Sequence, residues 1–353
     1  MLKIFTLLLG FMIFSPLFAS EQSMGVFYGA KVSEKPDWFK ESFLDFEEDV
    51  AEAAEQGRRV MLYFHQNGCP YCARLVQENF TDPVLKRYIQ QHFDSISLNM
   101  WGDREVVSIG GKSFTEKTLA AALKVQFTPT LLFLNEQGQV ILRLNGYQSP
   151  DKLRKALTFV ADKQELEQPF TSYMLAGQGD KQQSLIDEDF FLVQNNLQAQ
   201  LQQSDRPLAV FFEAAGCEDC VTLHQKVLTD APTRALLRQM DSIQLDVHAM
   251  DNIVTPQGNE ISQKAYAEQL GITYTPTVVL FDSEGKEVHR LEGFFKTFHV
   301  QSSLAYVLGK GYLKEPSFQR YISARAEKIR EKGYDVDIWG YKSLHPVDLR
   351  MED

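Results

Sequence analysis

All four cysteines of the chain lie in two Cys-x-x-Cys motifs, Cys69–Cys72 and Cys217–Cys220. A cysteine pair with this spacing at the start of a helix can form and break a disulfide, because the free backbone N–H groups and the helix dipole stabilise the first thiolate. We therefore expect Cys69 and Cys217 to attack a disulfide first. Cys72 and Cys220, one turn further in, should be more shielded and resolve the mixed disulfide. The motifs predict a thiol–disulfide exchange site in each half of the chain.

Two other uses of these cysteines are open. Structural disulfides are common in exported proteins, but a loop closed over so few residues gains little stabilisation from chain entropy. A zinc ion bound by both pairs would require the two helix starts to converge in space. We therefore expect a redox site, with no metal ion and no cofactor.

The residues around the two motifs predict the same elements in the same order. An apolar strand, 60–64 in the first half and 208–212 in the second, leads into each motif, and a helical pattern follows it. Further along each half, a Thr-Pro-Thr sequence precedes two apolar runs joined by a turn with a glycine, which predicts a hairpin. The motifs lie 148 residues apart (217 minus 69), and this period indicates a tandem duplication. We predict an α/β protein with two domains.

Composition and pattern divide the 353 residues further. A charged amphipathic helix is expected over 318–332, in a C-terminal extension that should form a cap on the second domain. The predicted segments are a signal peptide at 1–19, a lead-in at 20–37, domain one at 38–163, a linker at 164–187, domain two at 188–309 and the extension at 310–353.

The N-terminus has the pattern of a secretory signal peptide. Lys3 precedes an apolar run, 4–14, and cleavage is expected after Ala19. An uncleaved membrane anchor is the alternative, but the run is shorter than the roughly 20 residues of a transmembrane helix. We expect an exported protein without stable membrane insertion after cleavage. The net charge of −11 argues against nucleic acid as a partner.

Each half resembles a thioredoxin-fold domain, with Cys-x-x-Cys after the first core strand and Thr-Pro-Thr before the hairpin. Residues 38–163 further resemble the periplasmic thioredoxins of the SoxW type, which are associated with bacterial sulfur oxidation. That resemblance rests on 43–45 (Phe-Leu-Asp), 99–105 (Asn-Met-Trp-Gly-Asp-Arg-Glu) and 144–147 (Leu-Asn-Gly-Tyr). It implies a central mixed sheet flanked by helices in each domain, and a periplasmic protein of a Gram-negative type bacterium.

The resemblance also implies where a substrate binds. In this fold the prolines of Thr128-Pro129 and Thr275-Pro276 are cis and present a backbone edge beside the sulfurs, where an extended substrate docks.

The sequence departs from the thioredoxin pattern at two places in each half. The buried acid six residues before the first cysteine is replaced by Tyr63 and Phe211, and the preceding tryptophan is a glycine. The candidates for the proton acceptor are therefore His65 and Glu213, each four residues before the first cysteine. A solvated strand end is the alternative for both. His224 shares a helix face with Cys220, and we expect it on the helix surface.

The leading function is a periplasmic reductase of disulfides in partner proteins, recharged by a membrane thiol carrier that the resemblance implies (DsbD/CcdA-like). A disulfide oxidase or isomerase is one alternative, and a non-catalytic binding or chaperone module is another. Glu218 and Asp219 place negative charge beside Cys217, which opposes its thiolate and should make the second couple more reducing. We therefore expect electrons to pass from domain two to domain one.

Overall fold

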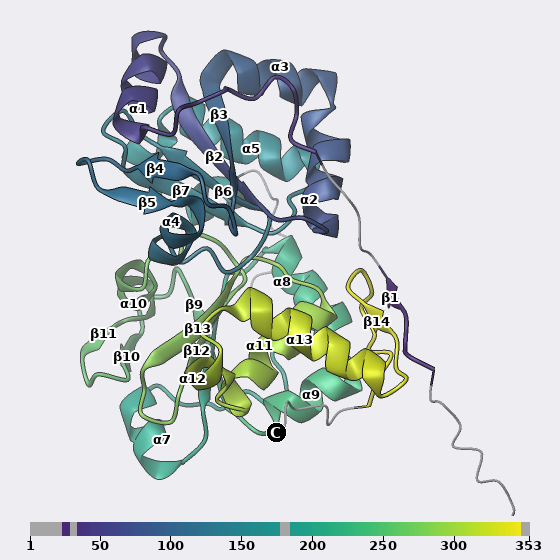
Figure 1. Ribbon diagram of the computed structural model, residues 1–353. Coiled ribbons are helices and arrows are strands. Elements are labelled where there is room, and N and C mark those ends of the chain that lie inside the picture. The colour runs from purple at the N-terminus through teal and green to yellow at the C-terminus, as the bar shows by residue number, and fades with distance from the viewer. Residues whose placement is uncertain (1–22, 29–33, 177–183, 347–353) are drawn as a thin grey trace, which may run out of the picture.

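The computed structural model describes residues 23–28, 34–176 and 184–346, and within them the same fold occurs twice. Figure 1 shows domain one in the upper half of the molecule and domain two in the lower half. The predicted fold class, two α/β domains in tandem with mixed sheets and a helical C-terminal region, is confirmed. The signal peptide predicted at 1–19 lies outside the described residues.

Domain one is built on a four-stranded sheet with the order β3-β2-β6-β7. The central strand β2 runs parallel to β3 and antiparallel to β6, which forms a hairpin with β7. β2 is buried along almost its whole length, as expected for an apolar strand covered on both faces. The strands are β2 (Arg59–His65), β3 (Phe93–Asn99), β6 (Thr130–Leu134) and β7 (Val140–Asn145).

Several helices of domain one begin at residues whose side chains satisfy free N–H groups of the first turn. Asp45 accepts hydrogen bonds from the backbone of residues 47 and 48 at the start of α1, and Asp82 does the same for α3, whose first residue is Pro83. A short hairpin, β4 (Glu105–Val107) with β5 (Ser113–Thr115), lies beside the sheet. The helices are α1 (Phe46–Glu55), α2 (Pro70–Arg74), η1 (Leu75–Phe80), α3 (Pro83–His92), α4 (Glu116–Ala122) and α5 (Pro150–Ala161).

Domain two repeats this arrangement, with the sheet order β13-β12-β8-β9 and a short hairpin of β10 and β11. Its strands are β8 (Leu208–Glu213), β9 (Asp241–Asp246), β10 (Asn252–Val254), β11 (Glu260–Ser262), β12 (Thr277–Phe281) and β13 (Glu287–Glu292). Its helices are α7 (Leu197–Gln203), α8 (Glu218–Thr222), η3 (Leu223–Val227), α9 (Ala231–Leu237), α10 (Gln263–Gln269) and α11 (Thr297–Leu308).

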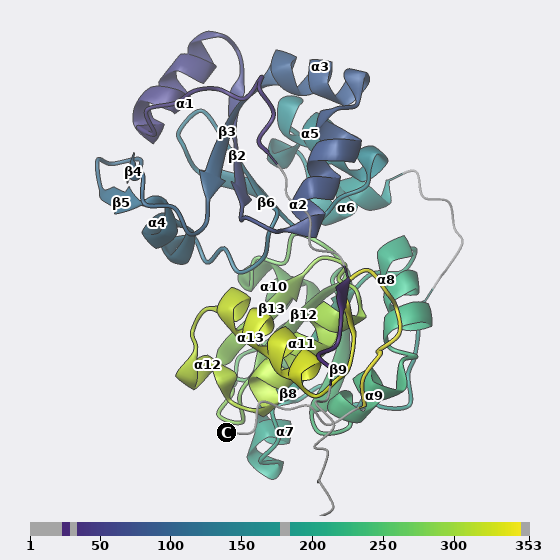
Figure 2. The same ribbon diagram turned by 45° about the vertical axis from the view of Figure 1, so that its right-hand side comes forward.

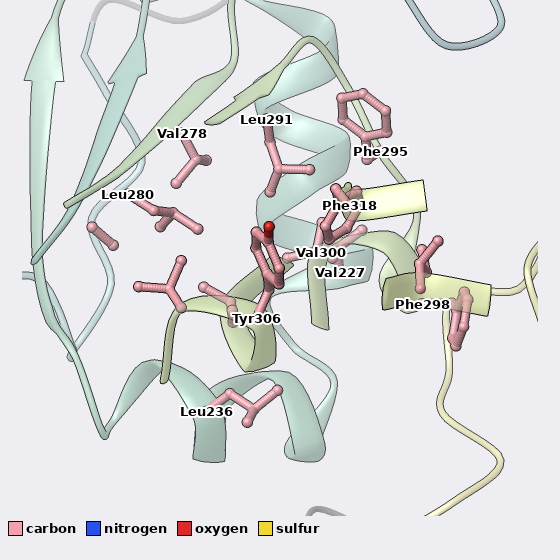
Figure 3. Packing of buried hydrophobic residues seen from close by; sticks show 14 of the residues in the cluster. Val227, Leu236, Val278, Leu280, Leu291, Phe295, Phe298, Val300, Tyr306 and Phe318 are labelled. Carbon is pink, nitrogen blue, oxygen red and sulfur yellow. The ribbon is translucent and has the colours of Figure 1, made fainter. Parts of the chain in front are cut away.

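Each sheet has a hydrophobic core on both faces. The largest of the four lies in domain two between β12, β13 and α11, and the side chains of Val278, Leu291 and Tyr306 meet there (Figure 3). Phe318, from the C-terminal extension, is 1 % exposed and belongs to the same core. The extension is therefore an integral part of domain two.

Two segments lie outside the repeated elements: the stretch between the domains and the C-terminal extension. Within the stretch for which we expect a linker, the chain forms η2 (Gln164–Leu166) and α6 (Phe170–Leu175), and Phe170 is buried against domain one. The extension forms α12 (Gly311–Lys314), α13 (Phe318–Glu331) and β14 (Val336–Asp337). β14 pairs in parallel with β1 (Phe27–Tyr28), so both ends of the described chain meet beside domain two (Figure 2).

Across the described residues, we find no helix with the length and apolar character needed to cross a membrane.

Candidate functional site

The first dithiol lies at the start of α2. Cys69 is the N-cap residue of this helix, and its Sγ accepts a hydrogen bond of 3.0 Å from the backbone N–H of Cys72. The two cysteines form a disulfide. Cys69 is 4 % exposed and Cys72 is fully buried, so Cys72 is the more shielded of the two. The N–H group that meets Cys69 Sγ in the disulfide would also stabilise its thiolate after reduction.

The second dithiol has the same geometry at the start of α8. The Sγ of Cys217 accepts a hydrogen bond of 3.1 Å from the N–H of Cys220, and the two form a disulfide. Each cysteine is thus bonded within its own motif, unlike the alternative in which all four bind one zinc ion. Gly216, directly before Cys217, has a φ of +78°, a conformation that a tryptophan at this position would adopt only with strain.

Both Thr-Pro peptide bonds, Thr128-Pro129 and Thr275-Pro276, are cis, as the resemblance implied. The carbonyl oxygen of Thr128 lies 3.5 Å from Cys69 Sγ, and that of Thr275 lies 3.5 Å from Cys217 Sγ. A backbone edge therefore borders the attacking sulfur in each domain.

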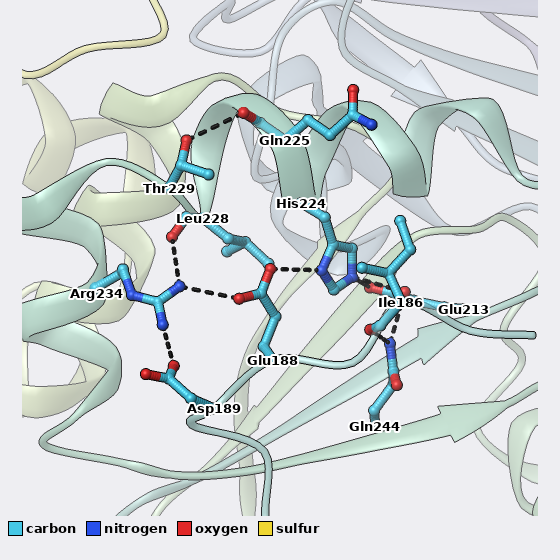
Figure 4. A network of polar contacts seen from close by, with 10 residues as sticks. All are labelled: Ile186, Glu188, Asp189, Glu213, His224, Gln225, Leu228, Thr229, Arg234 and Gln244. Atoms are coloured by element: carbon cyan, nitrogen blue, oxygen red, sulfur yellow. Dashed lines mark hydrogen bonds and ion pairs between the residues drawn. The ribbon is translucent and has the colours of Figure 1, made fainter.

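Glu213, a candidate proton acceptor, is buried at the end of β8. It is 1 % exposed, and both its carboxylate oxygens lie 3.0 Å from Nε2 of His224. Gln244 donates a further hydrogen bond to it (Figure 4). The alternative of a solvated strand end is therefore wrong for Glu213. Its position on β8 directs it toward the face on which η3 packs, because Phe211, two residues earlier, shares a core with Leu223 of η3.

His224 is buried as well, and our expectation of a surface residue is wrong. It lies one turn after Cys220 and is held between Glu213 and Glu188, whose carboxylate is 3.0 Å from Nδ1 (Figure 4). Burial opposes its positive charge, but the hydrogen bonds that the imidazole donates to the two carboxylates, together with their negative charge, outweigh burial and raise the pKa of His224. A Cys-x-x-Cys helix with a histidine on its inner face is the sequence signal that could have indicated this pair.

Domain one has a different arrangement at the equivalent place. His65, the other candidate, is partly buried, its ring stacks on Tyr63 with centroids 5.3 Å apart, and burial lowers its pKa. The Tyr63 hydroxyl, which stands where thioredoxins have the acid, is buried without a hydrogen-bond partner among the described residues. Val76 occupies the position of His224. The first dithiol thus has an imidazole on the strand, and the second has a carboxylate paired with an imidazole.

The two domains contact each other through equivalent residues. Phe127 precedes Thr128 in domain one, and its ring is buried in the core of domain two, 4.4 Å from the ring centroid of Phe295. Tyr274 precedes Thr275 in domain two and packs into the core of domain one. Each domain inserts the residue before its Thr-Pro pair into the other, so both dithiols lie near the same interface.

The third residue of each motif contacts the last helix of the other domain. Asp219 forms a salt bridge with Lys152 of α5 and accepts a hydrogen bond of 2.8 Å from the Tyr274 hydroxyl. Tyr71 lies against His299 of α11, with ring centroids 5.4 Å apart. Lys152 and His299 are each the third residue of their helix. Sequence reasoning missed both contacts, although the two helices follow the repeat.

A cavity of about 460 Å³ lies between the domains and has Cys69 in its wall. Domain one contributes the loop around Thr128, and domain two contributes Asp219 and Tyr274. A smaller pocket of about 30 Å³ has Cys217 in its wall, and Asp219 and Tyr274 line this pocket as well. The two dithiol sites are neighbours that share part of a wall.

The C-terminal extension packs against Tyr71, inside the first Cys-x-x-Cys motif. The Tyr71 hydroxyl donates a hydrogen bond to the carbonyl oxygen of Ile338, and the Tyr71 ring lies against Trp339 with centroids 4.3 Å apart. Gln319 of α13 donates to the carbonyl oxygen of Gln126, beside the cis-proline loop. The predicted cap on domain two therefore contacts domain one as well, at the edge where an extended substrate would dock.

Comparison with known proteins identifies both repeats. The model of the thioredoxin-like domain matches residues 46–161 and 173–308. No curated protein matches the chain. Among solved structures, a thioredoxin-fold protein from Helicobacter pylori is 17% identical and covers 42% of this chain and 92% of its own, with a TM-score of 0.32. A thioredoxin from Thermus thermophilus is 28% identical and covers 34% and 85%, with a TM-score of 0.28.

A putative disulphide-isomerase from Bacteroides thetaiotaomicron is 25% identical and covers 39% of this chain and 94% of its own, with a TM-score of 0.28. The family match extends over most of the chain and includes both cysteine motifs. The chain belongs to the thioredoxin-like domain family and carries that domain twice.

Proposed function

We propose that the protein is a periplasmic thiol–disulfide reductase that passes electrons from its dithiols to disulfides in partner proteins. One observation carries the proposal: in each domain a cysteine at a helix N-terminus lies beside a cis-proline backbone, with a more buried cysteine one turn away. We assign domain one to the SoxW-type thioredoxins on its residues 43–45, 99–105 and 144–147. The periplasmic location rests on the signal-peptide pattern at 1–19.

The reaction follows from the positions of the sulfurs. In the reduced protein the thiolate of Cys217 attacks one sulfur of the partner disulfide, and the other partner sulfur leaves as a thiolate that takes up a proton. Cys220 then loses its proton and attacks Cys217 Sγ. This second step breaks the bond between Cys217 and the attacked partner sulfur, which leaves as a thiol, and closes the disulfide of the motif. The same sequence applies to Cys69 and Cys72.

We propose Glu213 as the proton acceptor for Cys220, acting with His224. The carboxylate is buried and hydrogen-bonded to His224 of η3, and this imidazole lies one turn from the resolving cysteine. A carboxylate that is hydrogen-bonded to an imidazole can receive a proton in a buried site without leaving an isolated charge. We propose His65 as the proton acceptor for Cys72, since His65 occupies in domain one the strand position that Glu213 has in domain two.

We propose that electrons flow from domain two to domain one, although the charge beside Cys217 is partly compensated. Glu218 is exposed and adds negative charge beside Cys217, as expected. Lys152 from domain one pairs with Asp219, which offsets part of the charge that the sequence places there. The second couple should then still have the lower reduction potential. The difference between the two potentials should be smaller than if both carboxylates were unpaired.

The steady-state redox form in the cell separates this function from a disulfide oxidase or isomerase. A reductase recharged by a DsbD/CcdA-like membrane thiol carrier should be mostly dithiol, and an oxidase should be mostly disulfide. A non-catalytic binding or chaperone module would keep its function when Cys69 and Cys217 are both changed to serine.

Trapping tests the proposed function directly. The variants Cys72→Ala and Cys220→Ala cannot resolve the mixed disulfide, so partner proteins should remain covalently bound to Cys69 or Cys217. The matched controls are the same variants with the attacking cysteine also changed to serine, which should bind nothing covalently. If the trapping variants hold no more protein than these controls, the proposal is wrong.

A further inference from the structure

The first dithiol is difficult for a folded partner to reach. Both attacking cysteines are buried, Cys69 at 4 % and Cys217 at 5 % exposed, but Pro70 after Cys69 is buried, whereas Glu218 after Cys217 is exposed. Phe127, beside the cis-proline loop, is buried in domain two, and Trp339 lies over Tyr71. The interdomain cavity, whose volume of about 460 Å³ suits a small molecule, is therefore the space from which such a ligand can reach Cys69.

The wall of this cavity carries more positive than negative charge. Arg74, Lys152 and Lys296 line it, and Asp219 is the one carboxylate in the part of the wall that the structure describes. Asp219 is already paired with Lys152 and with the Tyr274 hydroxyl. The net charge of the wall is thus positive, in a chain whose overall charge is −11.

Lys296 is the cation best placed to meet a ligand. Its Nζ donates to the carbonyl oxygen of Trp339 and lies 4.8 Å from the ring centroid of Tyr341. No carboxylate of the described residues lies within salt-bridge distance of it. Arg74, in contrast, is paired with Glu78 at 2.8 Å. Burial lowers the pKa of Lys296, and the charges of Arg74 and Lys226 lower it further, while the carboxylate of Asp337 acts in the opposite direction.

We propose that the interdomain cavity is a binding site for small anionic disulfides, which the Cys69–Cys72 dithiol reduces to two thiols. This inference rests on the proposed function and adds a substrate class at the first dithiol: small anionic disulfides, besides the disulfides of partner proteins. The Cys69 thiolate attacks one sulfur of the ligand and releases the other as a thiolate. Cys72 then attacks Cys69 Sγ, releases the second thiolate and forms the motif disulfide. The two protons of the dithiol are transferred to the two product thiols.

The test uses three aliphatic disulfides of similar size: dianionic dithiodipropionate, neutral hydroxyethyl disulfide and dicationic cystamine. One full-length variant keeps only the first dithiol (Cys217→Ser with Cys220→Ser), and another keeps only the second (Cys69→Ser with Cys72→Ser). The rate constant for oxidation of each reduced variant is measured with each disulfide. The second dithiol, beside Glu218, is the internal control because its local charge is opposite.

We expect the ratio of the dianion rate to the dication rate to be about tenfold or more higher at the first dithiol than at the second. Lys296→Met should lower this ratio at the first dithiol by roughly threefold, and Lys296→Arg should retain it. Lys286→Met, which removes an exposed lysine in the turn between β12 and β13, outside the cavity wall, should leave it unchanged. Equal ratios at the two dithiols, or no effect of Lys296→Met, would overturn the inference. If neither dithiol reacts even with the neutral disulfide, the proposed function itself fails.

Discussion

Asn145 donates a hydrogen bond of 3.0 Å to the carboxylate of Glu292, and these two residues are the last residues of equivalent strands, β7 and β13. A contact between equivalent positions is what a two-fold interface between identical subunits produces. Here the two copies belong to one chain, and the same relation places Phe127 in domain two and Tyr274 in domain one. The duplicated domains therefore pack as a dimer would, with their cysteine sites at the interface.

Removing this contact should weaken the interface measurably. Asn145→Ala, Glu292→Ala and the double variant form a cycle, and the two changes should be non-additive by about 0.5–1.5 kcal/mol in the free energy of unfolding. The cycle is needed because Asn145 also accepts a hydrogen bond from Thr130. Urea denaturation measures the coupling, and additive effects would show that the hydrogen bond adds no stability.

Lys152 should tune the second dithiol from the other domain. Lys152→Met leaves Asp219 without its cation, which disfavours the Cys217 thiolate and makes the couple more reducing, by roughly 15–30 mV for a three- to tenfold change in the exchange constant. Asp219→Asn should shift the potential in the opposite direction.

Equilibration with glutathione buffers and alkylation measures each potential, with the Cys69–Cys72 couple as the control in the same molecule. An unchanged Cys217–Cys220 potential in Lys152→Met would contradict this role.

The sequence predicts the two domains, their strands and the cysteine positions because these depend on local pattern and on a repeat of constant period. It does not predict the interface, because Lys152, His299 and Asn145 are ordinary surface residues within each copy and gain partners only from the other copy. The cover by Trp339 is missed for a related reason, since the segment after α13 has no periodicity. Glu213 and His224 are individually visible in the sequence, but their burial depends on how η3 packs on the sheet.

His224 should make the stability of domain two depend on pH. Its pKa is raised in the folded protein, so its protonated form contributes stability that is fully present below the unfolded pKa of about 6.5 and is lost as the pH rises through the folded pKa. The stability difference between wild type and His224→Gln should therefore be largest near about pH 6 and decrease toward about pH 9. Thermal or urea denaturation over this range measures it. His248→Gln, at an exposed position, is the control, and a difference that grows with pH would contradict the account.

His289 should act with the opposite sign. Burial lowers its pKa to about 3, so the neutral form stabilises the fold above the unfolded pKa of about 6.5, and this stability is lost as the pH falls. Between pH 6.5 and about pH 5 this one residue should cost the wild type about 2 kcal/mol. His289→Gln should remove that part of the acid sensitivity. The measurement is urea denaturation at each pH, and an identical loss in wild type and variant would refute the prediction.

Trp339 should limit access to the first dithiol. In Trp339→Ala the ring that lies against Tyr71 is absent, so iodoacetamide should alkylate Cys69 of the reduced protein several-fold faster. Cys217 in the same sample should react at its wild-type rate. Mass spectrometry of the two cysteine peptides gives both rates, and equal acceleration at both cysteines would indicate general loosening instead of a local cover.

Reduction of a protein disulfide by the purified full-length chain tests the central claim most directly. With dithiothreitol as electron donor, the wild type should accelerate the reduction of insulin, and changing Cys69 and Cys217 together to serine should return the rate to that of dithiothreitol alone. If the double variant reduces insulin as fast as the wild type, the two dithiols are not the reactive groups and the account is contradicted.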